Sequence, residues 1–102
     1  MNLDTLYEKL EGRNARHYDE MTSRTDWTTP DGDAIIDGDV QRVITIGEAE
    51  IEMSFSFRCI NGRVETHLLN RDEILTTGIE GDPQDVLSIL PSELLGKPDL
   101  DL

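Results

Sequence analysis

The sequence contains few cysteine and aromatic residues. Its single cysteine, Cys59, cannot form a disulfide within the chain, and aromatic residues make up 5% of the 102 residues. No apolar run is long enough for a membrane-spanning helix, and the N-terminus lacks the apolar core of a secretory signal. We therefore expect a cytoplasmic protein without membrane contact, held together by one hydrophobic core.

Positive charge is also scarce, and the formal net charge is −13. The acidic residues are concentrated in two segments. Residues 26–52 contain eight acidic residues and one arginine, and residues 81–102 contain five acidic residues and one lysine. Such a field repels nucleic acid and anionic membranes and attracts basic protein surfaces. Two explanations stay open: the acidic blocks bind a basic partner or mimic a polyanion, or they only keep the protein soluble, as in a salty cytoplasm.

Helical patterns are expected at the two ends of one domain that spans residues 1–102. Apolar residues at i, i+3, i+4 and i+7 predict a first helix, namely Leu3, Leu6, Tyr7 and Leu10. The stripe resumes with shifted phase through about Ser23, which predicts one kinked helix or two short ones. A second helix is expected from Asp82-Pro83, where Asp is a good N-cap and Pro suits the first turn. Residues 98–102 are expected to be a loose tail.

Between the helices, turn signals predict an antiparallel meander of four to five strands. Asn61-Gly62 is the strongest, since a type I′ hairpin turn needs positive φ at both central residues. The other expected turns are Thr29–Gly32, Asp37-Gly38, a four-residue loop Gly47–Glu50 and Asn70–Glu73. With helices covering one apolar sheet face, the predicted fold class is α+β.

Strict alternation places apolar side chains on one face of the central strand, at Ile51, Met53, Phe55, Phe57 and Cys59. Pairing outward from the expected turns puts Arg42 opposite Phe55 and His67 opposite Ser56. His67 should then lie on the polar face, together with the apolar exceptions Val43 and Leu69. Across the expected Asp37-Gly38 turn, Asp33 should face Arg42 as an ion pair.

The repeated Asp-Gly-Asp motif supplies Asp31, Asp33, Asp37 and Asp39. Clustered carboxylates suit hard cations, but an EF-hand loop needs an acid or amide at its fifth position and Glu at its twelfth. Here Ile35 and Arg42 stand at those positions, so the motif reads as turns. We expect no metal site and no cofactor.

Catalytic combinations are weak in this sequence. Cys59 belongs to the expected apolar face, which separates it from His67 and favours a structural thiol. Ser56, His67 and Glu65 share the expected polar face, but a flat sheet offers neither a pocket nor an oxyanion hole. A non-catalytic role is therefore favoured over an enzyme.

The favoured function is a small acidic module that engages a protein partner through its acidic surface or its polar sheet face. Trp27 is the expected anchor, because Trp is common at interface hot spots. The full set of predicted binding residues is Tyr18, Trp27, Asp31, Asp33, Asp37, Asp39 and His67. The alternative is a small-ligand binder or enzyme with a pocket between sheet and helices or at a dimer interface, and a homodimer through the sheet face stays open.

Overall fold

Four long antiparallel strands form one sheet in which each strand pairs with its neighbour in sequence, in the order β1-β2-β3-β4. The computed structural model describes residues 2–12 and 14–100. The elements are α1 (Leu3–Glu11), β1 (Ala15–Thr28), β2 (Ala34–Ile46), β3 (Ala49–Ile60), β4 (Arg63–Thr77), α2 (Pro83–Ile89) and a 3₁₀ turn (Ser92–Leu94). The predicted α+β class, with a helix at either end of an antiparallel meander, is confirmed.

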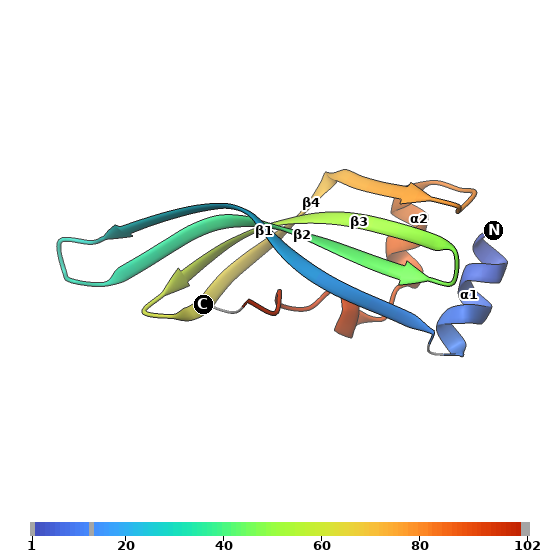
Figure 1. Ribbon diagram of the computed structural model, residues 1–102, viewed down its shortest axis with the longest axis horizontal. Coiled ribbons are helices and arrows are strands. Elements are labelled where there is room, and N and C mark those ends of the chain that lie inside the picture. Colours follow the sequence, from blue (N-terminus) through green and yellow to red (C-terminus); the bar gives the residue numbers. More distant parts are fainter. Residues whose placement is uncertain (1, 13, 101–102) are drawn as a thin grey trace.

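The molecule is elongated, with extents of 52 × 24 × 19 Å. Figure 1 shows both helices near one end of the sheet, while the β1–β2 hairpin extends beyond them at the other end. Leu6 of α1 and Val86 of α2 are fully buried in one cluster with apolar residues of β2 and β3, so both helices pack on the same sheet face. We call this the core face, and the opposite one the outer face.

The N-terminal helix is shorter than predicted. It begins after Asn2, whose side-chain oxygen accepts a hydrogen bond from the Thr5 N–H, and it ends at Gly12. The prediction of helix through Ser23 is wrong, because residues 15–28 form β1. The stretch is rich in Thr and aromatic residues, which favour strands, and pairing along the whole length of β2 outweighs the weak helical stripe.

The Asp37-Gly38 hairpin was also predicted wrongly, since both residues lie inside the continuous strand β2. Position 38 needs glycine because the neighbouring groups leave no room for a side chain. A Cβ at this position would lie 2.7 Å from Cε1 of Phe57 and 2.3 Å from the carbonyl oxygen of Ser23. The predicted ion pair between Asp33 and Arg42 therefore does not exist, and Arg42 pairs with Asp19 of β1 instead.

The β2–β3 loop is two residues long, Gly47-Glu48, rather than the predicted four. Ile44 consequently lies opposite Ile51, and Arg42 lies opposite Met53 instead of Phe55. The error is a shift of two residues, which keeps every side chain on its predicted face because the side-chain period of a strand is two.

The Asn61-Gly62 turn is confirmed, with φ of 52° and 84° at its two central residues. Just beyond it, an extra residue in β4 breaks the predicted register between Arg58 and Cys59. His67 then lies opposite Phe57, and Leu69 opposite Phe55, so both belong to the core face. Their predicted placement on the polar face is wrong, because one bulge residue inverts the facing of all that follow.

The predicted turn at Asn70–Glu73 is a second irregularity within β4. Residues 71–74 lie opposite Met53 alone, and the strand continues to Thr77. The Asn70 side chain accepts a hydrogen bond from the Asp72 N–H, which shapes the bend locally. The sheet therefore has four strands.

After α2, which Asp82 caps through the Gln84 N–H, the chain returns along the sheet (Figure 1). The predicted loose tail has contacts in its described part: Pro98 is buried, and Leu100 packs against a cluster of Val40, Phe57 and Cys59. Residues 101 and 102 lie outside the described residues. The returning segment, residues 91–100, is called the C-terminal strap below.

Candidate functional site

The outer face of the sheet presents six rows of side chains, because consecutive strands bring their paired residues to one line across the sheet. From the β1–β2 turn towards the helical end, the rows are Trp27–Ile35–Ile60–Arg63, Thr25–Asp37–Arg58–Thr66, Ser23–Asp39–Ser56–Leu68, Glu20–Gln41–Ser54–Asn70, Tyr18–Val43–Glu52–Leu75 and Arg16–Thr45–Glu50–Thr77. Within residues 2–12 and 14–100, both helices pack on the other face. The outer face is thus the broadest surface on which function could lie.

A three-residue cluster fixes one end of this face. Arg58 donates from Nε and Nη2 to the two carboxylate oxygens of Asp37, at 2.7 and 3.0 Å. Trp27 donates from Nε1 to the same carboxylate at 3.1 Å, and the Arg58 guanidinium lies 5.7 Å from the centre of the Trp27 ring. The hydrogen bonds from Arg58, and secondly from Trp27, lower the pKa of Asp37. The cluster holds an exposed Trp in one orientation.

Asp39 occupies the next row and is held differently. The hydroxyl groups of Ser23 and Ser56 each donate to its carboxylate, at 2.8 Å from opposite sides. No ion pair reaches Asp39 among the described residues. Neutral donors orient this carboxylate while leaving its charge uncompensated, so it can meet a cationic or polar group of a partner.

Apolar side chains flank the polar centre on both sides. Ile35 and Val43 on β2 are only 4% and 5% exposed although no helix covers them, and they lie beside Trp27 and Tyr18 of β1. Three large side chains of the same rows project outward: Trp27 is 43% exposed, Tyr18 58% and Leu75 60%. Aromatic residues are enriched at protein interfaces, so the exposed Trp27 and Tyr18 are the members of this face that most resemble interface residues.

Four of the predicted binding residues lie on the outer face: Trp27, Asp37 and Asp39 in three successive rows, and Tyr18 two rows further along. Asp31 and Asp33 lie apart from them in the β1–β2 turn, where Asp33 accepts a hydrogen bond from the Asn61 side chain. His67 is not part of the site, because it lies on the core face with its ring 6.4 Å from that of Phe55.

Sequence reasoning missed several members of this face. Asp37 was expected in a turn, so its ion pair with Arg58 of the neighbouring strand was not predicted. Leu68 and Ser23 reach the outer face only because bulges at Glu65 and Thr22 shift the register. A search for acid–base pairs across neighbouring strands could have found Asp37 with Arg58, while nothing local marks the bulges.

The thiol of Cys59 is buried in the cluster with Val40 and Phe57. Burial raises its pKa, so the reactive thiolate is less populated than in an exposed cysteine. The bulge brings His67 to the same face as Cys59, which corrects the expected separation, but no hydrogen bond joins them in the described part of the chain. Likewise, no cluster of three or more His, Cys, Asp or Glu side chains in that part could hold a metal ion.

A buried ion pair holds the C-terminal strap against the core face. Arg42, 1% exposed, donates from Nε and Nη2 to the Asp19 carboxylate at 2.7 and 2.9 Å. Its remaining donors reach the carbonyl oxygens of Leu94, Gly96 and Lys97 on the strap. The Asp99 N–H completes the network by donating to Asp19 at 2.8 Å. Every buried polar side-chain atom of the described residues has a partner, so this network is structural.

This network makes stability depend on pH. Burial alone would raise the pKa of Asp19, but the hydrogen bonds from Arg42 and Asp99 outweigh it and lower that pKa below 3.8. A depressed native pKa means that the contribution is complete above the unfolded-state value and is lost as pH falls below it. We expect the urea midpoint to drop on acidification from pH 5 to pH 2 more steeply in the native chain than in Asp19→Asn. Parallel slopes for the two proteins would contradict this assignment.

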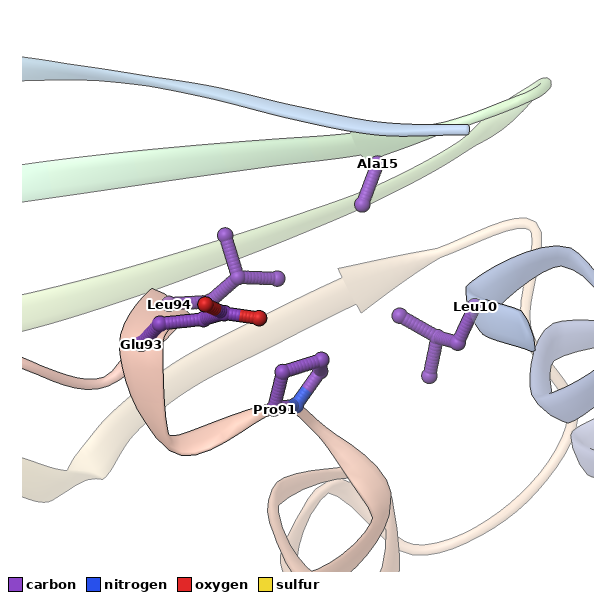
Figure 2. Close-up of a pocket in the computed structure, with 5 residues that line it drawn as sticks. All are labelled: Leu10, Ala15, Pro91, Glu93 and Leu94. Atoms are coloured by element: carbon purple, nitrogen blue, oxygen red, sulfur yellow. The ribbon is translucent and has the colours of Figure 1, made fainter. Parts of the chain in front are cut away.

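A cleft opens on the core face between the end of α1, the start of β1 and the strap (Figure 2). Its volume is about 220 Å³, and it is lined by Leu10, Ala15, Pro91, Glu93 and Leu94. In Figure 2 the side chains of Leu10, Pro91 and Leu94 project into one space, with the Glu93 carboxylate at its margin. None of the predicted binding residues lines it.

Comparison with known proteins adds no relative. No protein-family model matches the sequence, and no match to a curated protein or to a solved structure was found. Neither helix of the described residues has the length and hydropathy needed to cross a membrane.

Proposed function

We propose that this chain is a non-catalytic interaction module that binds a protein partner through the outer face of its sheet. The observation that carries the proposal is that side chains of this face are held in place by hydrogen bonds. Trp27 is anchored, the Asp39 carboxylate is oriented, and apolar side chains lie on either side. Preformed contacts lower the entropy lost when a partner binds, which favours affinity at modest area.

The charge distribution favours this face over the acidic blocks as a whole. On the outer face the acidic residues are spread over five of the six rows, at Asp37, Asp39, Glu20, Glu52 and Glu50. The outer face carries five acidic residues against three arginines. A partner with polar and apolar groups and charges of both signs would fit it.

Small-ligand binding is the weaker alternative. The cleft beside Pro91 holds about 220 Å³, below the roughly 300–1,000 Å³ usual for ligand sites. A second hollow holds about 410 Å³, but it is lined by Lys9, Asn14, Arg16 and Gly47 and lacks the apolar wall of a typical ligand pocket. The depression over Gly38 on the outer face, about 370 Å³, belongs to the proposed interface.

Photo-cross-linking tests the proposal. A photoreactive phenylalanine analogue replaces Tyr18 on the outer face, and the same analogue replaces Tyr7 on α1 as the matched control, since both tyrosines are more than half exposed. In the source cells, we expect Tyr18 to yield discrete protein adducts, identified by mass spectrometry, and Tyr7 to yield none in common with it.

A substitution at Trp27 provides a second test of the proposed function. Trp27→Ala removes the anchor without touching the core, so the Tyr18 adducts should weaken while the fold, followed by circular dichroism, is kept. Absence of adducts at Tyr18, or the same adducts from Tyr7, would rule out the outer face as the binding surface.

A further inference from the structure

Consider a line parallel to the strands and midway between β2 and β3. It divides the outer face into two halves that nearly complement each other. With four strands in order, a two-fold rotation about that line lays β2 of one copy over β3 of another and β1 over β4. Each row then meets the same row of the second copy in reverse order. Complementarity of one surface with itself is the requirement for an isologous dimer.

Both aromatic residues of the face meet apolar or cationic groups in this arrangement. In the first row, Ile35 meets Ile60 of the second copy, and Trp27 meets Arg63, a pair suited to cation–π contact. In the fifth row, Tyr18 meets Leu75. The exposed large side chains of the face are thereby covered.

Charges alternate across the same line. Asp37 meets Arg58 of the second copy, so the two internal pairs join into a ring of two carboxylates and two guanidinium groups. Glu20 meets Asn70, Glu52 meets Val43, and Glu50 meets Thr45. No row sets two like charges against each other, although the whole chain carries −13. The arrangement thus avoids direct contact between like charges, which would disfavour association.

The area is sufficient for a stable contact. Four strands about 4.8 Å apart and six rows about 6.7 Å apart cover roughly 700 Å² per copy. The pair would bury roughly 1,400 Å², above the about 1,000 Å² expected of a specific interface. Twisted sheets pack aligned at about −30°, which keeps β2 and β3 in closest contact near the axis.

We propose that the partner of the outer face is a second copy of this chain, bound face to face with β2 against β3. This inference rests on the proposed function, because it names the partner of the same surface. The fourth row places Gln41 over Ser54 of the second copy, beside the axis, and this contact allows a decisive test.

Sedimentation equilibrium of the full chain, from low micromolar to submillimolar concentration, should give twice the 11.5 kDa chain mass. Ser54→Arg brings two arginines together at the axis, and Gln41→Asp brings two aspartates together. Each variant alone should dimerise at least tenfold more weakly. Mixed in equal amounts, they should form a heterodimer, because each arginine then faces an aspartate. Tyr7→Arg, far from the axis on α1, should dimerise as the native chain does.

Each outcome decides the inference. A native chain that stays monomeric overturns the second-copy proposal, as does a dimer that neither variant weakens or that the mixture fails to restore. Circular dichroism of each variant excludes loss of fold as the cause. The proposed function fails separately: a monomer that still yields Tyr18 adducts to another protein keeps the outer face as a binding surface, while a monomer without adducts removes both.

Discussion

Replacing Asp19 with alanine is expected to lower the free energy of unfolding by about 3–5 kcal/mol. The substitution leaves the Arg42 guanidinium buried without its counter-ion, since both side chains are at most 5% exposed. It also removes the acceptor of the Asp99 N–H, so the C-terminal strap loses this attachment and stays bonded to a guanidinium that has no counter-ion. Because small domains have only about 5–15 kcal/mol of stability, the urea midpoint should fall sharply.

Two comparisons separate the buried pair from a general loss of charge. Asp26→Ala breaks the exposed pair with Arg24, whose side chains are about half exposed, and should cost far less than Asp19→Ala because solvent screens exposed pairs. The double substitution Asp19→Leu with Arg42→Met removes both charges and should recover much of the loss, because an apolar pair needs no counter-ion. If Asp19→Ala and Asp26→Ala cost the same, the network does not hold the strap.

Gly38→Val should be the second large effect, with a loss of about 1–3 kcal/mol or more from overpacking. The new side chain would meet the backbone carbonyl of Ser23, which cannot rotate away, and the ring of Phe57 in the core. The strands β1 and β2 would have to separate locally. Thermal unfolding followed by circular dichroism measures the loss.

Gly62→Ala is the matched control for that substitution. Gly62 has φ of 84° with nothing within 4 Å of an added Cβ, so alanine there costs only backbone strain, of order 1–2 kcal/mol. Gly38→Ala should already be destabilising although its backbone is not left-handed. A Gly38→Val variant as stable as the native chain would mean that β1 and β2 are not in close contact at this point.

The elements that sequence reasoning predicted well are those with strong local signals. The Asn61-Gly62 turn needs positive φ that few residues tolerate, and the alternation along β3 is uninterrupted from Ile51 to Cys59. Asp82 with Pro83 marks the start of α2 just as clearly. In each case the residue types are dictated by the backbone or by burial within a few positions, so the local pattern suffices.

The failures share a physical cause, which is that tertiary pairing decided the outcome. Residues 15–23 carry a faint helical stripe, yet they gain a full row of hydrogen bonds by pairing with β2. The bulge near Glu65 adds one residue without altering composition, and it moves His67 and Leu69 from one face to the other. The β3 part of the candidate face was therefore predictable from the sequence, whereas the β1 part and the part of β4 beyond its bulge were not.

The order of the strands has a consequence for how the chain folds. Since each strand pairs with its neighbour in sequence, the sheet can grow hairpin by hairpin with short loops to close. The contact between Asp99 and Asp19 instead joins residues 80 positions apart. We expect substitutions in the Asn61-Gly62 hairpin to slow folding, and substitutions in the strap to speed unfolding. The strap would then act as the final closure that sets the lifetime of the native state.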